Sequence, residues 1–359
     1  MKNRSFLTNG ARRIKQKLLL LILFSSILFS GCSKLTPGES VEPGEKEYIT
    51  RTELLLSTVV TINLYDKQDQ DILDGCFELI AKYEEVFSRT SETSELYALN
   101  HRLLPQVDGA YQISEDLADI IKKALYYGDV SEGGFDISIE PVSSIWDFLS
   151  DPPVIPTEQQ LEKALPLVNY KYIHLKDQTV SFENDEVRLD LGGIAKGYIA
   201  DRVKEYLKSQ GVESAIINLG GNVLCVGTKP DGTPFHIGIQ KPFADRNETV
   251  AVMDISDLSV GSSGIYERFF EKDDIIYHHI LDTKTGYPIQ NGVLSVTILS
   301  KYSVDGEGLS KTCFHLGLEK GLEFIETLPD TYAVFITSDY QIYYSKGFKD
   351  AIKVTENEN

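Results

Sequence analysis

Cysteine is scarce in this chain, which has four in 359 residues, and their spacing is irregular. This spacing indicates neither a disulfide framework nor a zinc site. Cys76, Cys225 and Cys313 are therefore expected to pack as small apolar side chains. Cys32 differs from these three, because it lies just after the only long hydrophobic run, separated from it by Ser30 and Gly31.

Basic side chains are also in deficit, with 35 Lys and Arg against 54 Asp and Glu and a net charge of −19. So acidic a chain argues against nucleic acid as a partner and against wide contact with anionic lipid. Internal repeats, low-complexity runs and a second transmembrane candidate are missing from the sequence. The chain has 42% hydrophobic residues, which at this length is enough to form one large core or the cores of two coupled lobes.

The first 31 residues have the pattern of a targeting segment. Six basic side chains and no acidic one precede an apolar run from Leu18 to Phe29 that is short for a bilayer span. Ser30-Gly31-Cys32 resembles a bacterial lipobox, with Phe29 where Leu is usual. We expect 1–31 to be a lipoprotein signal peptide, Cys32 to be lipidated, 32–47 to be a polar tether and 48–355 to form the folded domain. The alternative is a simple cleavable signal. The expected location is the extracytoplasmic face of the cell membrane.

The rest of the chain interleaves strand and helix patterns without regular βαβ spacing, which favours an α+β fold. Ser114 and Thr157 are expected to cap helices, the first of which should stop at Gly128. A helix over 72–87 and a last helix over 319–327 are predicted from apolar spacing. The predicted strands are 59–65, 214–218, 235–240, 250–255, 275–281, 293–299 and 332–336.

The stretch from Asp190 to Tyr198, DLGGIAKGY, predicts a strand end, a glycine turn with positive φ and a helix N-terminus. Such a turn exposes amide groups that favour an anion, and Lys196 adds a cation. The spacing fits neither a dinucleotide fingerprint nor a Walker A loop. The alternative is a tight turn followed by a solvated lysine.

Six motifs in this order resemble the ApbE-type FAD:protein FMN transferases over about residues 50–350. They are FSRTSETSEL, GGFDISIEP with the downstream Trp146, DLGGIAKG, NLGGN, SSGIYER and HILDTKTGYP. The resemblance implies an α+β, T-fold-related fold that binds FAD and Mg²⁺. It also implies transfer of the FMN half of FAD to a threonine of an exported acceptor protein, through a phosphoester, with release of AMP.

The resemblance assigns roles to individual residues. Lys196 would face FAD, and the Gly193 carbonyl would reach the metal. His279 would take the proton of the acceptor threonine, since imidazole titrates near neutrality, and Asp282 would assist. The flavin nucleotide and its cleft would be formed by Arg89, Thr90, Ser91, Asp136, Ser263 and Gly264.

One motif departs from the family. Where the family has D-A-L-S-T, with Asp and Thr as magnesium ligands, this chain has Glu307-Gly308-Leu309-Ser310-Lys311. Glu307 can bind a hard cation, but an ammonium has only donors. Either Lys311 supplies positive charge in place of part of the metal site, or Ser310 or Asp305 takes over as ligand, or the site is weakened and the protein binds FAD without efficient transfer. The rival functions are an FAD pyrophosphatase, which releases FMN and AMP, and a non-catalytic FAD-binding lipoprotein.

Overall fold

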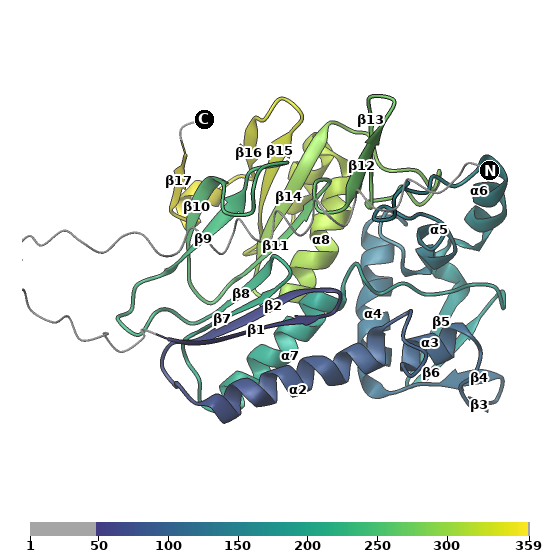
Figure 1. Ribbon diagram of the computed structural model, residues 1–359, viewed down its shortest axis with the longest axis horizontal. Helices are drawn as coiled ribbons and strands as arrows, with labels where there is room; N and C mark the ends of the chain where they lie inside the picture. The colour runs from purple at the N-terminus through teal and green to yellow at the C-terminus, as the bar shows by residue number, and fades with distance from the viewer. Residues whose placement is uncertain (1–47, 358–359) are drawn as a thin grey trace, which may run out of the picture. The chain divides into compact units, whose positions relative to one another are not determined.

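An eight-stranded antiparallel sheet forms the centre of the computed structural model, which describes residues 48–357 (Figure 1). Strand β14 is buried along its whole length. In order across the sheet, the strands are β1 (Ile49–Leu55), β2 (Thr58–Leu64), β7 (Ala215–Leu219), β8 (Asn222–Val226), β11 (Ser259–Gly264), β14 (Val293–Ser300), β15 (Tyr332–Thr337) and β16 (Ile342–Tyr344).

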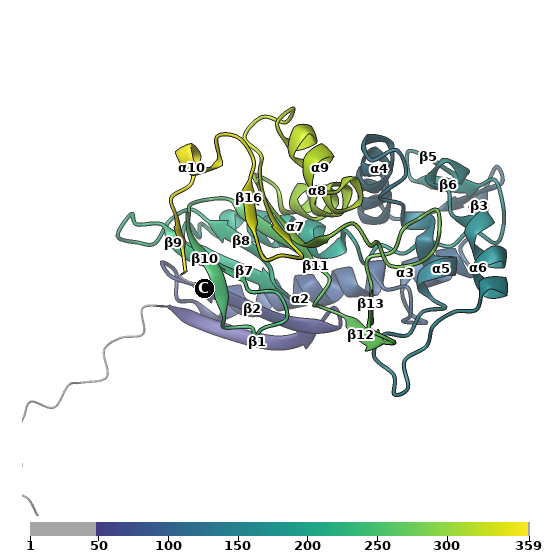
Figure 2. The same ribbon diagram turned by 90° about the horizontal axis from the view of Figure 1, so that it is seen from above.

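A row of helices covers one face of this sheet: α2 (Gln70–Phe87), α7 (Ala195–Ser209), α8 (Ser303–Leu316) and α9 (Leu318–Ile325). Each helix contacts the next, and α8 also contacts β8, β11 and β14. The sequence explains α2, because Asp69 caps its first turn and its apolar side chains recur on one face. The main core lies between the sheet and these helices (Figure 2).

A second group of elements contains helices α3 (Glu95–Asn100), α4 (Glu115–Val130), α5 (Glu140–Ser143) and α6 (Glu158–Ala164). A four-stranded sheet accompanies them, in the order β3 (Gln106–Val107), β4 (Ala110–Gln112), β6 (Thr179–Phe182), β5 (Ile173–Lys176). Helix α4 joins this group to the first, since it contacts α2 and α8. Trp146 is buried here with Val142 and Leu161.

The remaining elements lie at the periphery. Strands β9 (Phe235–Gln240), β10 (Thr249–Ile255) and β17 (Val354–Glu356) form a three-stranded sheet, and α10 (Phe348–Ala351) precedes β17. Strands β12 (Phe269–Lys272) and β13 (Ile275–His278) form a separate hairpin, which Figure 1 shows at the edge of the molecule. The chain leaves this hairpin directly into residues 279–288, which include two predicted catalytic residues.

Two close contacts fix α8 relative to its neighbours. A Cβ on Gly197 of α7 would collide with the backbone carbonyl of Ser303, and a Cβ on Gly261 of β11 would lie 3.0 Å from the Gly306 carbonyl carbon. Asp201 of α7 accepts from the backbone amides of Ser303 (2.8 Å) and Val304 (2.9 Å), so α7 caps α8. The first turns of both helices are thereby held side by side.

The α+β prediction is confirmed, and several local predictions agree with the structure. Strand β9 has the predicted bounds, and Thr157 forms a capping box with Gln160. Cys76, Cys225 and Cys313 are free and buried, as expected.

Some local predictions of secondary structure were wrong. Helix α4 continues past Gly128 to Val130, and Gly128 serves packing within the helix, since a Cβ there would lie 2.7 Å from Tyr170 Cδ2. Strand β13 ends at His278 rather than at Leu281. Residues 187–191 form no strand; the amide and carbonyl of Leu189 instead bond to the Asn100 side chain, at 2.8 and 2.9 Å.

The predicted signal peptide, Cys32 and the tether lie outside the described residues. Within 48–357, no helix combines the length and the apolar character needed to cross a membrane.

Candidate active site

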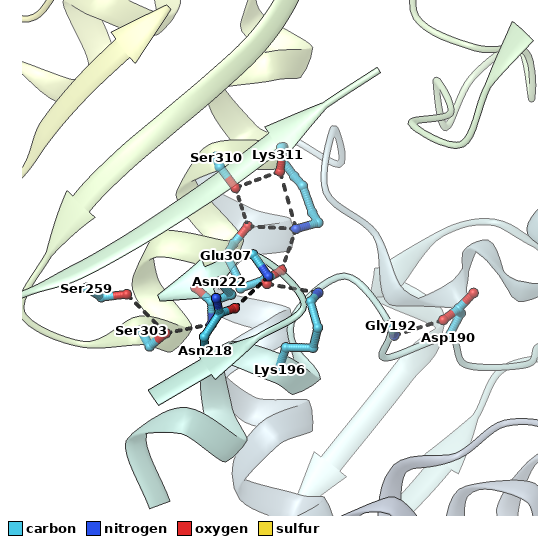
Figure 3. A network of polar contacts seen from close by, with 12 residues as sticks. Asp190, Gly192, Lys196, Asn218, Asn222, Ser259, Ser303, Glu307, Ser310 and Lys311 are labelled. Carbon is cyan, nitrogen blue, oxygen red and sulfur yellow. Dashed lines mark hydrogen bonds and ion pairs between the residues drawn. The ribbon is translucent and has the colours of Figure 1, made fainter. Parts of the chain in front are cut away.

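The carboxylate of Glu307 lies between two ammonium groups in the interior of the molecule (Figure 3). Lys196 Nζ is 2.9 Å from Oε1, and Lys311 Nζ is 2.6 Å from Oε2. Glu307 is 3% exposed, so this is a buried charge cluster and not a surface pair. One carboxylate and two ammonium groups leave a net positive charge.

The local sequence explains how these charges meet. Glu307 and Lys311 are one helical turn apart on α8 and share a face. Lys196 lies in the first turn of α7, which the Gly197 contact holds against the first turn of α8. The sequence alone left open a solvated lysine, but Lys196 is ion-paired.

Burial would raise the pKa of Glu307, but the Lys196 and Lys311 charges more than offset it and lower that pKa to about 2. Burial lowers the pKa of Lys311 from its ordinary value, and the Glu307 carboxylate opposes this shift. Glu307 is therefore ionised at neutral pH.

Lys311 is held by three oxygen atoms. Besides Glu307 Oε2, its ammonium donates to the Glu307 backbone carbonyl (3.3 Å) and to Ser263 Oγ (3.5 Å). Ser263 Oγ in turn lies 2.8 Å from Ser310 Oγ, and the Ser310 hydroxyl is 3.0 Å from the Glu307 carbonyl. A Cβ on Gly193 would lie 3.4 Å from Lys311 Cδ. The structure thus brings Lys196, Gly193, Ser263, Glu307, Ser310 and Lys311 together.

Gly193 and Gly192 do not have positive φ, contrary to the predicted glycine turn. Their lack of a side chain serves close contacts instead: a Cβ on Gly193 would also lie 3.2 Å from Phe135 Cε2, and one on Gly192 would lie 3.0 Å from Asp190 Oδ1. The Gly192 amide donates to Asp190 Oδ1 at 2.9 Å.

Arg89 belongs to a second charged cluster. Its guanidinium lies 3.3 Å from Asp190 Oδ2 and 3.5 Å from Glu140 Oε1, and Ser143 donates to Asp190 at 2.8 Å. Glu140 and Asp190 stood in the sequence motifs, but the sequence reasoning gave them no role. Each is a charged residue inside an otherwise glycine-rich or apolar motif, and this feature of the sequence could have identified both as site residues.

Thr90 and Ser91 follow Arg89 in a turn before α3. Ser88 Oγ accepts from the amides of Thr90 (3.3 Å) and Ser91 (3.1 Å), so the turn is held by its own side chains. Thr90 is exposed and Ser91 half-buried. Their contact with a nucleotide stays a prediction.

Asp136 is buried, with its oxygens occupied by the Ser138 amide (2.7 Å), the Ser138 hydroxyl (2.6 Å) and the Tyr170 amide (2.7 Å). Burial raises its pKa, and these donors oppose the shift. In the structure it fixes the loop that precedes α5, and its role in nucleotide binding stays a prediction.

His279 is half-buried, and its Nδ1 atom has no hydrogen-bond partner among the described residues. Burial, helped by the Arg268, His278 and Lys311 charges, lowers its pKa to about 3. The imidazole is therefore neutral, with one ring nitrogen able to accept a proton. Its neighbour His278 is committed to the fold, because Nε2 lies 3.0 Å from the Ile289 carbonyl and Nδ1 accepts from the Ile280 amide.

Asp282 shapes the loop after His279. Its Oδ1 accepts from the amides of Lys284 (2.8 Å) and Thr285 (2.9 Å), and the Trp146 indole donates to the Gly286 carbonyl at 2.9 Å. Two of the sequence motifs therefore meet here.

Two glycines of the motifs make room for rings. His315 packs over Gly134, where a Cβ would collide with its ring. Gly264 likewise makes room for the Tyr266 ring.

The arrangement does not fit a magnesium ion as the side chains lie. Both Glu307 oxygens face ammonium groups, and Asp305 accepts from the Tyr127 hydroxyl at 2.6 Å. Within residues 48–357, no group of three His, Cys, Asp or Glu side chains is arranged to hold a metal. Magnesium takes six oxygen ligands, several of them water or substrate phosphate, and is usually held by one or two carboxylates, so the obstacle here is the pairing of both Glu307 oxygens with lysines. The arrangement does suit an anionic group, through Lys196 and the first turn of α7.

Comparison with known proteins assigns the fold and the family. The ApbE family model matches residues 56–336. A FAD:protein FMN transferase from Treponema pallidum is 31% identical, covering 87% of this chain and 90% of the relative, and one from Klebsiella pneumoniae is 34% identical over 81% and 90%.

Solved structures of ApbE proteins have the same fold. The flavin transferase ApbE from Vibrio cholerae superposes with a TM-score of 0.75 at 26% identity, covering 85% of this chain and 99% of that one. The ApbE protein from Thermotoga maritima gives 0.76 at 28% identity, over 87% and 100%. The chain therefore belongs to the ApbE family.

Proposed function

We propose that this protein is an FAD:protein FMN transferase. The observation that carries the proposal is the family match over residues 56–336, with relatives of that name that align over nine-tenths of their length. The buried Lys196–Glu307–Lys311 cluster supports it, because a net positive site beside a helix N-terminus suits a pyrophosphate.

The reaction that we propose is a phosphoryl-type displacement. The hydroxyl oxygen of an acceptor threonine attacks the phosphorus on the FMN side of the FAD pyrophosphate. The bond from that phosphorus to the bridging oxygen breaks, and AMP leaves with that oxygen. The products are a threonine phosphoester of FMN and free AMP. Catalysis of this kind depends mainly on positioning and charge stabilisation.

In this scheme Lys196 and Lys311 stabilise the charge that develops on the phosphate oxygens. Both side chains are less than a third exposed, so their charges act with little screening by water. Arg89, which lies between Asp190 and Glu140 on the loop before α3, keeps the role toward the flavin nucleotide that the resemblance implies.

His279 would take the threonine proton. With a pKa near 3 it is neutral but weakly basic. The bound pyrophosphate would bring negative charge close to the imidazole, which favours its protonated form and makes it a better base. The proton then passes from the imidazole to solvent after AMP has left.

The acceptor is an exported protein with a threonine that can enter the site, since transfer to a protein requires one. Lipidation at Cys32 would hold the enzyme on the extracytoplasmic face of the membrane, where such an acceptor lies. The hydrophobic run before Cys32 and its lipobox-like sequence support this location.

The resemblance implies that the reaction depends on Mg²⁺, but no step of the proposed reaction uses the ion. Both oxygens of Glu307 are paired with lysines, so the described site does not fit the ion.

Incubation of the purified protein with FAD and candidate exported acceptors tests the proposal. Transfer gives an acceptor that stays fluorescent in a denaturing gel, together with AMP. A pyrophosphatase would give free FMN and AMP with an unlabelled acceptor, and a binding protein would leave FAD unchanged. Either of these two results would reject the transferase assignment.

A further inference from the structure

By the resemblance, Lys311 stands where the family motif, D-A-L-S-T, has a threonine, and its ammonium points to Glu307 (Figure 3). A lysine at the position of this threonine would leave the charge of the site unchanged if its side chain extended into solvent. Here its side chain is 22% exposed. The substitution therefore changes the charge inside the site.

The three contacts of the Lys311 ammonium match its three N–H donors: a carboxylate oxygen, a backbone carbonyl and a hydroxyl. Carboxylate, carbonyl and hydroxyl oxygens are also the ligands that a hard divalent cation prefers. The ammonium thus occupies an oxygen-lined position of the kind that such a cation would take.

A divalent cation cannot share this position with the ammonium. At a separation of about 5 Å and an effective dielectric near 20, their repulsion is large compared with one ordinary hydrogen bond. Lys196 adds a second positive charge on the other carboxylate oxygen, at 2.9 Å.

We infer that the Lys311 ammonium replaces the divalent cation, so that this enzyme binds the pyrophosphate of FAD and transfers FMN without Mg²⁺. The part that concerns transfer rests on the proposed function, whereas the part that concerns FAD binding does not. With Lys196, the Lys311 ammonium gives the site two positive charges, one fewer than a lysine and a divalent ion would give.

The first test measures FAD affinity of the purified full chain in detergent, by flavin fluorescence, with EDTA or with excess Mg²⁺. The wild type is expected to give the same dissociation constant within about two-fold in both buffers. Lys311→Thr, which removes the ammonium, is expected to bind FAD at least ten-fold more weakly in EDTA, the effect of one lost charged hydrogen bond. Mg²⁺ should restore its affinity. Lys320→Thr, an exposed lysine on α9, is the matched control and should behave as the wild type.

Electron paramagnetic resonance with Mn²⁺ as the probe gives a readout that is independent of FAD chemistry. Lys311→Thr with FAD should bind Mn²⁺, and the wild type should not. A wild type that binds Mn²⁺ at this site, or that needs Mg²⁺ for FAD affinity, would overturn the inference. The wild-type measurements decide this even if the variant does not fold.

Transfer assays then separate the two proposals. Equal transfer by the wild type in EDTA and in Mg²⁺ supports both. Transfer that requires Mg²⁺ overturns the inference but leaves the proposed function standing. Metal-independent FAD binding without transfer in either buffer supports the binding part and contradicts the proposed function.

Discussion

Replacement of Glu307 by Gln removes the negative charge that holds two lysines in the interior. The variant keeps nearly the same shape, but it leaves Lys196 and Lys311 without a counter-charge around a side chain that is 4% exposed. Breaking a buried ion pair by removing one partner costs about 3–5 kcal/mol. Since a large domain loses about 2 °C in Tm per kcal/mol, we expect a fall of roughly 6–10 °C.

Thermal and urea unfolding measure this loss, with Glu323→Gln as the control because Glu323 is exposed on α9. That control should change the free energy of unfolding by less than about 0.5 kcal/mol. Glu307→Gln combined with Lys311→Met should be less destabilised than the sum of the single variants, by about 0.5–3 kcal/mol, because the second change removes an unpaired charge. An unchanged Tm for Glu307→Gln, or strict additivity, would refute the buried cluster.

The remaining predictions concern the imidazoles and the membrane anchor. His279→Ala should keep FAD affinity within a few-fold while transfer falls by roughly 10²–10⁴, the range for a lost general base; near-normal turnover would rule out that role. Burial lowers the pKa of His278 to about 4, so between about pH 6.5 and 4 the unfolded state binds a proton that the folded state does not. The free energy of unfolding should therefore drop as the pH falls, by at most about 1.4 kcal/mol per pH unit from this residue, and His278→Gln should have a shallower pH dependence. Burial raises the pKa of Asp201 to about 6, so its contribution to the free energy of unfolding changes with pH in the opposite direction over the acidic part of this range. Asp201 is present in both the wild type and His278→Gln, so the difference between them cancels this contribution. Finally, Cys32→Ala should release the protein from the membrane fraction, whereas full retention would indicate an uncleaved anchor.

The sequence predicted best what depends on neighbouring residues. The bounds of β9 follow from alternation along the strand itself, and the start of α6 follows from Thr157 and Gln160 three residues apart. The ApbE resemblance and the α+β class are confirmed by the family match and by the solved relatives.

The sequence predicted less where distant segments decide the conformation. A glycine at position 128 predicts a helix stop, yet Gly128 lies inside α4, where the Tyr170 ring packs on it. Gly193 reads as a turn glycine, yet it has ordinary φ and makes room for Phe135 and Lys311. No local pattern shows that Lys196 and Glu307 form a pair, because their contact depends on the close crossing of α7 and α8.

The Glu307 motif is interpreted from the sequence as a departure from the family, and the pairing of Glu307 with two lysines becomes visible only in the structure. Among the readings left open, Asp305 as a replacement ligand is disfavoured by the geometry, since its Oδ1 already accepts from the Tyr127 hydroxyl at 2.6 Å. The predicted roles of Thr90, Ser91, Asp136 and Asp282 toward FAD or the acceptor stay predictions.

The most direct test of the transferase assignment is the ratio of AMP released to FMN bound covalently to the acceptor. Both products can be measured in one reaction, AMP by chromatography and bound FMN by intact-protein mass spectrometry with the modified residue located by fragmentation. The proposed function predicts one AMP for each FMN group, attached to a threonine. AMP in step with free FMN, and an acceptor of unchanged mass, would contradict it.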